Sequence, residues 1–331
     1  MLSRVCGMCR VLSGSLGPSG GGTGAREQRV RRDASSGSGW TEVFVDVELA
    51  SSCPVAEAVA RGFSLLVLHE LASSAECEKL RREASAAALA RRRRSTILKQ
   101  ALLEDVPAEV VVPGQVRMPI VEMLGDESQT LCDQLLLRGV DRVHRALPTL
   151  LPALFGDSGI GSTPWPQVRE EPPQHAAPSL GPSPSAAARA VPSITRDLGL
   201  VFTPGEPACN VYTAGGEFTP HEDGGSLTLL LPLSSADAFT GGGTGFWSGA
   251  ARGTEARASG EHALHVRPES GPSFVLTPPA GTALIFGGNV THAGEPVHGG
   301  ERAVFVASFS NGSRAPTKRG LLDGLISMLA G

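Results

Sequence analysis

The chain has 331 residues, and an apolar fraction of 41% supports a hydrophobic core and excludes global disorder. Its 41 glycines and 25 prolines favour a structure with many turns over a helical bundle. A net charge of −4 gives no general attraction to nucleic acid or to an anionic membrane, and no apolar run approaches the length of a membrane span.

The first 39 residues are expected to form a leader or tail before the folded region. Arg4, Arg10 and Arg26 lie in a stretch rich in serine and glycine, and the first acidic residue is Glu27. This composition is typical of organelle transit peptides, and it also fits an ordinary disordered tail. A transit peptide predicts a mitochondrial or plastid location, whereas a plain tail predicts a cytoplasmic one.

Strands and helices are expected between residues 40 and 162. Alternating apolar residues predict a first strand, at Val43, Val45, Val47 and Leu49. The apolar run Phe63–Leu71 predicts a second strand, and the capping-box pair Ser73 and Glu76 predicts that a helix begins there. The arginines at 91–94 of this helix favour a solvated face over a nucleic-acid patch. Another helix is predicted over Glu127–Ala146.

The second half of the chain is expected to be β-rich. Residues 163–193, rich in proline, alanine and serine, predict an extended insertion that buries no core. Many short strands with closely spaced turns then favour a sandwich or jelly roll, and a short helix is predicted over Gly320–Leu329. The expected strands are Leu200–Phe202, Asn210–Tyr212, Ser226–Leu233, Leu264–Val266, Ser273–Leu276, Thr282–Phe286 and Arg302–Ser310.

Two histidines and a carboxylate form a candidate metal site. His221 and Asp223 are two positions apart, so in an extended chain their side chains leave the same face. His292 follows far downstream, in a turn between two strong strands. Two imidazoles and one carboxylate form the facial triad that holds non-haem Fe(II) and leaves positions open. His262 and His265 also have a spacing compatible with metal binding, but we interpret them as exposed histidines at a strand end.

Arg302 is the candidate anion-binding residue. It shares strand parity with Val304 and Val306, whereas Ala303 and Phe305 face the other way. A buried guanidinium requires an anionic partner, and its planar fork pairs with a carboxylate through two hydrogen bonds. A dicarboxylate co-substrate would supply that partner; the alternative is a surface arginine at the start of a strand.

Several stretches of the sequence carry a resemblance to a known family. They are Phe63–Glu83, Asn210–Asp223, Ser226–Thr228, Gly241–Phe246, Pro278–Phe286, His292–Val297 and Gly299–Arg302. Together they resemble the prolyl 4-hydroxylase-like branch of the 2-oxoglutarate/Fe(II)-dependent oxygenases over about residues 60–311. Many collagen-type members have lysine at the position of Arg302, and this chain departs from them there.

The resemblance implies a mainly β fold, with a double-stranded β-helix (jelly roll) core and flanking N-terminal α-helices. It implies that His221, Asp223 and His292 bind Fe(2+), and that 2-oxoglutarate is bound by Arg302, Tyr212 and Thr228. O2 would be the other co-substrate and ascorbate the reductant. The expected domains are a leader (1–39), N-terminal strands and supporting helices (40–162), the insertion (163–193), the dioxygenase core (194–313) and a C-terminal tail (314–331).

The implied reaction is hydroxylation of a peptidyl (prolyl-type) or small-molecule substrate, with release of succinate and CO2. The carboxylate of Asp223 favours hydroxylation over halogenation, which would need that position free for halide. Demethylation or desaturation would be another outcome at the same site, and a catalytically silent jelly-roll binding module is the alternative from a different class. No nucleic-acid partner and no membrane span are expected, and no oligomeric state follows from the sequence.

Overall fold

The computed structural model describes residues 10–12, 30–32, 39–102, 114–155, 200–248 and 271–311. Several predicted features lie outside these residues. They are most of the leader, the insertion 163–193, the strand Leu264–Val266, His262 and His265, and the C-terminal tail with its helix Gly320–Leu329.

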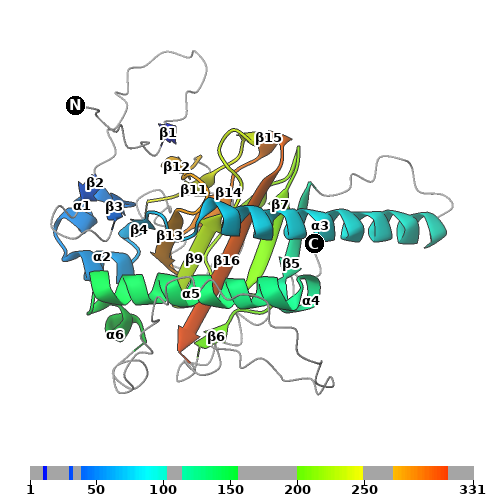
Figure 1. Cartoon of the computed structure of the whole chain (residues 1–331). Helices are drawn as coiled ribbons and strands as arrows, with labels where there is room; N and C mark the ends of the chain where they lie inside the picture. Colours follow the sequence, from blue (N-terminus) through cyan, green and yellow to red (C-terminus); the bar gives the residue numbers. More distant parts are fainter. Residues whose placement is uncertain are drawn as a thin grey trace, which may run out of the picture.

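The described residues form a mainly β structure, as predicted, in which the paired strands are antiparallel (Figure 1). The larger sheet contains β2 (Val30–Arg32), β3 (Trp40–Phe44), β4 (Ser64–Leu68), β5 (Gln115–Pro119), β6 (Leu200–Phe202), β7 (Ala208–Tyr212), β9 (Leu227–Pro232), β13 (Ala283–Gly287) and β16 (Arg302–Asn311). The smaller sheet contains β1 (Arg10–Leu12), β8 (Phe218–His221), β11 (Thr244–Phe246), β12 (Phe274–Thr277) and β14 (His292–Gly294). A separate pair is formed by β10 (Phe239–Gly241) and β15 (Val297–Gly300).

Strands that are distant in sequence are neighbours in both sheets. The larger sheet has the order β2-β3-β4-β13-β9-β16-β7-β5, and β6 also pairs with β16. The smaller sheet has the order β1-β12-β11-β14-β8. The central position of β16 places its side chains between those of β9 and β7 on both faces of the larger sheet.

Helices cover one face of the larger sheet. They are α1 (Val47–Ser51), α2 (Val55–Ala60), α3 (Ser74–Leu102), α4 (Ile120–Met123), α5 (Asp126–Ala146) and α6 (Leu150–Phe155). The long helices α3 and α5 lie across the front of the sheet in Figure 1, and the end of α3 runs past the sheet edge. Among the helices that the structure describes, none combines the length and the apolar character needed to cross a membrane.

The alternation of side chains along β16 divides the core into two layers. Ala303, Phe305 and Phe309 are buried together with the helices. Val304 faces the opposite way, into a second apolar cluster between the two sheets that also contains Phe246. The parity predicted for this strand is therefore confirmed, and it directs Arg302 into the space between the sheets.

The predicted capping box begins α3. The Ser73 hydroxyl accepts a hydrogen bond from the backbone N–H of Glu76 (3.3 Å), and the Glu76 carboxylate accepts one from the backbone N–H of Ser73 (2.7 Å). Arg138 on α5 donates to the same carboxylate (2.7 Å). The cap therefore provides hydrogen-bond partners for backbone N–H groups at the start of α3, and it also links the two long helices.

We expect Glu76→Gln to lower the free energy of unfolding by about 1 kcal/mol at pH 7, a value limited by solvent screening of the partly exposed carboxylate. The hydrogen bond from Arg138 is the main cause that lowers the pKa of Glu76 to about 2, against the opposing effect of burial. Because this folded-state pKa lies below the unfolded value of about 4.3, the stabilisation is complete above pH 4.3 and disappears as the pH falls towards 2.

Urea unfolding at pH 7 and at pH 3 measures this effect. The difference between wild type and Glu76→Gln should shrink at the lower pH. Glu78→Gln, at an exposed residue of the same helix that pairs with Arg81, is the matched control and should change the stability less. An equal loss from Glu76→Gln at both pH values would show that the cap does not act through the ionised carboxylate.

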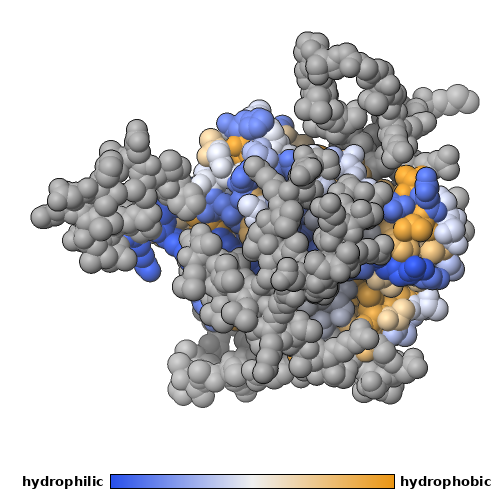
Figure 2. Space-filling view, turned by 180° about the vertical axis from the view of Figure 1, so that it is seen from behind, coloured by the Kyte–Doolittle hydropathy of each residue, from blue (hydrophilic) through white to orange (hydrophobic). Residues whose placement is uncertain are grey.

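The strand predicted across residues 43–49 is wrong in its second half. The strand β3 ends at Phe44, and α1 begins at Val47, because the Asp46 side chain caps that helix by accepting a hydrogen bond from the backbone N–H of Leu49 (3.1 Å). Val47 and Leu49 are 37% and 44% exposed, so their alternation does not mark a buried face. Figure 2 shows apolar surface on the side of the molecule where α1 and α2 lie.

Candidate metal centre

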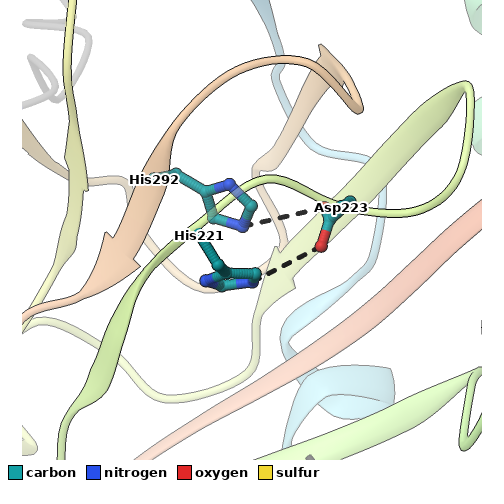
Figure 3. A group of neighbouring side chains, drawn as sticks. All are labelled: His221, Asp223 and His292. Atoms are coloured by element: carbon teal, nitrogen blue, oxygen red, sulfur yellow. Dashed lines mark ion pairs between the residues drawn. The ribbon is translucent and has the colours of Figure 1, made fainter. Parts of the chain in front are cut away.

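Strand pairing in the smaller sheet brings the two predicted histidine ligands together. His221 is the last residue of β8 and His292 the first residue of β14, and they are direct cross-strand partners. Their ring centroids are 4.4 Å apart. Asp223 follows β8 by two residues, and its side chain points at both imidazoles (Figure 3). One ligand atom from each of the three residues lies within 4.8 Å of the others.

Backbone carbonyls set the tautomers of both histidines. His221 Nδ1 lies 2.9 Å from the carbonyl oxygen of Thr219, and His292 Nδ1 lies 3.0 Å from that of Val290. Because a carbonyl only accepts, each Nδ1 carries the proton and each Nε2 keeps its lone pair. The two Nε2 atoms face Asp223, at 3.4 Å and 3.7 Å from its carboxylate oxygens. Two imidazoles oriented in this way are ready to ligate a metal ion.

The charge states also suit a metal ion. Burial lowers the pKa of His292 to about 4, although the negative charge of Asp223 opposes the shift. Burial also favours protonation of Asp223, but His292, His221 and a hydrogen bond from Thr228 Oγ1 hold the pKa of this carboxyl well below its usual range. At neutral pH the centre therefore presents the neutral imidazole of His292 and the carboxylate of Asp223 beside the imidazole of His221, and two imidazoles with one carboxylate are the donor set of a non-haem Fe(II) facial triad.

Glycines allow the two ligand loops to lie back to back. A Cβ atom on Gly288 would lie 1.8 Å from the carbonyl oxygen of Gly225 and 3.2 Å from that of Asp223. No side chain fits at this position unless the loop that carries Asp223 moves.

We therefore expect Gly288→Ala to weaken metal binding by about 10–100-fold, the range typical when the support of a ligand is disturbed. Calorimetric titration with Mn(II), an oxidation-resistant substitute for Fe(II), measures the affinity. Gly271→Ala is the control, because a Cβ at Gly271 meets no atom within 4 Å. Unchanged affinity in Gly288→Ala would mean that the loops relax without moving Asp223.

A pocket between the two sheets opens onto this centre. It contains about 390 Å³ of empty space, part of it open to solvent. Its wall is formed by Arg117, Glu206, Asn210, Tyr212, Phe218, His221, Asp223, Leu230, Thr244, His292, Ala293, Gly294, Arg302, Val304 and Val306.

Arg302 lies in this wall as a buried cation. Its side chain is 4% exposed, and its Nη2 donates to Thr244 Oγ1 at 2.9 Å. The guanidinium carbon is 5.2 Å from the ring centroid of Tyr212, its cross-strand neighbour. Burial lowers the pKa of Arg302, and within the described part of the chain no carboxylate accepts a hydrogen bond from it. The negative charge of Glu295 opposes this shift, but no hydrogen-bonded carboxylate within the described residues offsets the burial of the guanidinium.

The other two predicted co-substrate residues differ in position. Tyr212 lines the pocket beside Arg302, and burial raises its pKa, so the phenol is neutral. Thr228 is fully buried and is not part of the pocket wall; its hydroxyl donates to Asp223 Oδ2. The geometry of Thr228 therefore favours support of a metal ligand over contact with a co-substrate.

The sequence reasoning assigned no role to several polar residues of the pocket. Asn210 lies inside a stretch that carried the family resemblance, and Thr244 lies in another. Arg117 and Glu206 lie outside the sequence motifs described above. The single charge within the apolar strand Val116–Met118 was the signal for Arg117, whereas Glu206 lies in a loop and has no comparable pattern.

Comparisons of sequence find no relative of this chain: no protein-family model matches it, and neither does any curated protein. Comparison of structures finds a 2OG-Fe(II) oxygenase family protein from Burkholderia pseudomallei, at 16% identity and a TM-score of 0.23, covering 39% of this chain and 56% of that one. This chain thus spans little more than half the length of that protein.

Two prolyl hydroxylases are also found. The viral collagen prolyl hydroxylase of Paramecium Bursaria Chlorella virus-1 has 13% identity and a TM-score of 0.34, over 73% of this chain and 93% of that one. The prolyl-4-hydroxylase of Pseudomonas putida has 16% identity and a TM-score of 0.34, over 77% and 97%. At these scores the likeness carries no functional weight, and the function proposed below rests on the geometry of the site. Solved 2-oxoglutarate/Fe(II) oxygenases, including prolyl hydroxylases, are among the proteins to which this chain is similar.

Proposed function

We propose that the protein is an Fe(II)- and 2-oxoglutarate-dependent dioxygenase that hydroxylates a peptidyl, prolyl-type, or small-molecule substrate. O2 is the other co-substrate, succinate and CO2 are released, and ascorbate serves as reductant. The observation that supports the proposal most strongly is that the metal centre and the buried Arg302 face one pocket. The two sheets that enclose this pocket would correspond to the double-stranded β-helix of such enzymes.

His221, Asp223 and His292 would hold the iron through two Nε2 atoms and a carboxylate oxygen. Their arrangement fits the ion, because the Nδ1 protons are engaged by carbonyls and the carboxylate is ionised. Bound there with 2-oxoglutarate, iron would supply the activation of O2 and the oxidation of the substrate. The protein's own contribution is the fixed geometry of three ligands on one side of the ion.

Arg302 would bind the distal carboxylate of 2-oxoglutarate. Its planar fork provides two parallel N–H donors for a carboxylate, while Thr244 and the Tyr212 ring hold it in place. Binding of this anion would give the buried guanidinium a directly hydrogen-bonded carboxylate. The co-substrate is therefore favoured by the electrostatics of the site as well as by hydrogen bonds.

Aromatic side chains would keep water away from one side of the centre. The rings of Phe286 and Phe218 lie 4.7 Å and 4.5 Å from those of His292 and His221, respectively. Phe246 stacks at 6.3 Å from His292. This apolar wall lowers the local dielectric and strengthens the interaction of the ligands with a cation.

Turnover of 2-oxoglutarate tests the proposal without a known substrate. Purified protein with Fe(II), ascorbate and air should convert 2-oxoglutarate slowly to succinate, followed by NMR, and Asp223→Ala should not. A search of peptide and metabolite pools by mass spectrometry should then find a product that has gained one oxygen atom. Folded, iron-loaded protein that forms no succinate with any pool would favour the alternative, a catalytically silent jelly-roll binding module.

A further inference from the structure

A buried ion pair lines the same pocket and has no part in the metal centre or in the contacts of Arg302. Arg117 comes from β5, and Glu206 comes from the loop between β6 and β7. Arg117 Nη2 lies 2.5 Å from Glu206 Oε1, with side chains 16% and 4% exposed. Both residues belong to the pocket wall with the three metal ligands. A buried ion pair is no reliable gain in stability, so its position next to the candidate reaction centre calls for a functional reason.

The guanidinium of Arg117 has spare hydrogen-bond donors. Glu206 accepts from it through one oxygen, and the other oxygen accepts from the backbone N–H of Ser308. No other side-chain acceptor for Arg117 is found within the described residues. Since a guanidinium carries five N–H donors, most of those of Arg117, a residue of the pocket wall, are not used by Glu206. Glu206, in contrast, is fully engaged and acts as the support of Arg117.

Arg117 lies at the end of the pocket away from Arg302. In the larger sheet Arg302 on β16 pairs with Tyr212 on β7, and Tyr212 pairs with Gln115 on β5. Arg117 follows Gln115 by two residues on β5. It therefore lies one strand beyond Tyr212 and two residues further along the sheet. Burial raises the pKa of Glu206, Arg117 opposes the rise, and the nearby charge of Asp223 adds to it. The ion pair shares the pocket wall with the metal centre, on the side that a co-substrate anchored at Arg302 would leave open.

The charges of the pocket are balanced without a substrate. Its charged side chains are two cations, Arg117 and Arg302, and two anions, Glu206 and Asp223. Under the function proposed above, Fe(2+) and the dianion of 2-oxoglutarate also cancel. An anionic substrate group beside Arg117 would bring an uncompensated buried charge, whereas a neutral acceptor would use the spare N–H donors at no such cost.

We propose that Arg117, held in place by Glu206, is the substrate anchor of the pocket, and that it binds an uncharged carbonyl oxygen such as that of a peptide amide. This inference rests on the proposed function and narrows its substrate class. The group to be oxidised then belongs to a neutral, amide-containing segment, not to a free carboxylic acid.

The test uses the visible band of the anaerobic Fe(II)–2-oxoglutarate complex, which responds when a substrate enters the site. Two pools of small molecules are compared: N-acetyl amino acid N-methylamides, which are uncharged at the backbone, and the corresponding N-acetyl amino acids, which carry a carboxylate. We expect the amide pool to perturb the band of the wild type at a concentration at least tenfold below that needed for the acid pool.

Arg117→Gln/Glu206→Gln keeps the charge balance and permits a hydrogen bond between the two amides, but it removes the guanidinium. We expect this variant to form the band and to lose the response to the amide pool. Arg117→Lys, which keeps the charge without the planar fork, should respond more weakly than the wild type. It serves as the second variant if the double substitution does not fold.

Four results would overturn the inference. The first two are a stronger response to the acid pool and a response to neither pool. The third is an unchanged response in both Arg117 variants. The fourth is loss of the band itself in the double variant, which would show that the ion pair binds the co-substrate. Absence of the band in the wild type is a different result, because it would contradict the proposed function and not the role of Arg117 alone.

Discussion

His292→Ala is expected to weaken metal binding by more than about 10–100-fold, the range typical of substitutions that remove only a residue supporting a ligand. The substitution removes one of three donors from a centre whose geometry is fixed by the pairing of β8 and β14. Only two of the three ligands, His221 and Asp223, would then remain to bind the ion. Calorimetric titration of wild type and variant with Mn(II) measures the ratio of the two dissociation constants.

The control for this substitution is His298→Ala. His298 is an exposed histidine on β15, outside the pocket wall. It should bind Mn(II) as the wild type does, and urea unfolding should show that both variants are folded under the conditions of the titration. If His292→Ala bound the ion with unchanged affinity, the ligand triad proposed here would be incorrect.

Arg302→Gln is expected to raise the dissociation constant for 2-oxoglutarate by at least about 30-fold, equivalent to about 2 kcal/mol, the low end for loss of a buried charge pair. Glutamine can keep the hydrogen bond to Thr244 but offers no charge and no fork to a carboxylate. Because the arginine of the free protein is buried with no carboxylate accepting from it in the described chain, the variant should not lose stability.

Equilibrium binding of 2-oxoglutarate to the Mn(II)-loaded proteins measures the first effect, and urea unfolding of the metal-free proteins measures the second. Arg302→Lys provides the graded comparison, since it retains the charge but not the bidentate geometry, and it should fall between wild type and Arg302→Gln. Equal affinity in all three proteins would place the distal carboxylate elsewhere. A large loss of stability in Arg302→Gln would instead give the arginine a structural role.

Local patterns in the sequence predicted those parts of the structure that depend on neighbouring residues. The capping box at Ser73 and Glu76 marked the start of α3, because its two hydrogen bonds form within one helical turn. The alternation that begins at Arg302 identified the two faces of β16, because parity in a strand is a purely local property.

The strands β8 and β14 and the helix α1 were not predicted from the sequence. The two strands depend on long-range pairing, and the helix depends on local competition between strand and helix. The strands β8 and β14 have three or four residues each and little apolar periodicity, and the pairing of His221 with His292 forms only when the chain between them has folded back. Val47 and Leu49 continued an alternating pattern, but the side chain of Asp46 offers the backbone a helix cap instead.

The contact between the polar residues of the pocket wall was also not predictable from local sequence patterns. Arg117 and Glu206 come from a strand and a loop that are far apart in sequence, and β5 joins the sheet through its pairing with β7. A single charge in a short apolar strand does not reveal which carboxylate will meet it. Their contact therefore required the three-dimensional structure, although each residue is visible in the sequence.

Anaerobic titration of the wild-type protein with Fe(II) and 2-oxoglutarate tests most directly whether the pocket binds the two together. The proposed function predicts a visible charge-transfer band that saturates at one iron and one 2-oxoglutarate per chain, because the ligand triad and Arg302 face the same space. Folded, iron-loaded protein that gives no such band on addition of 2-oxoglutarate would contradict the proposed function and leave the pocket as a binding site of another kind.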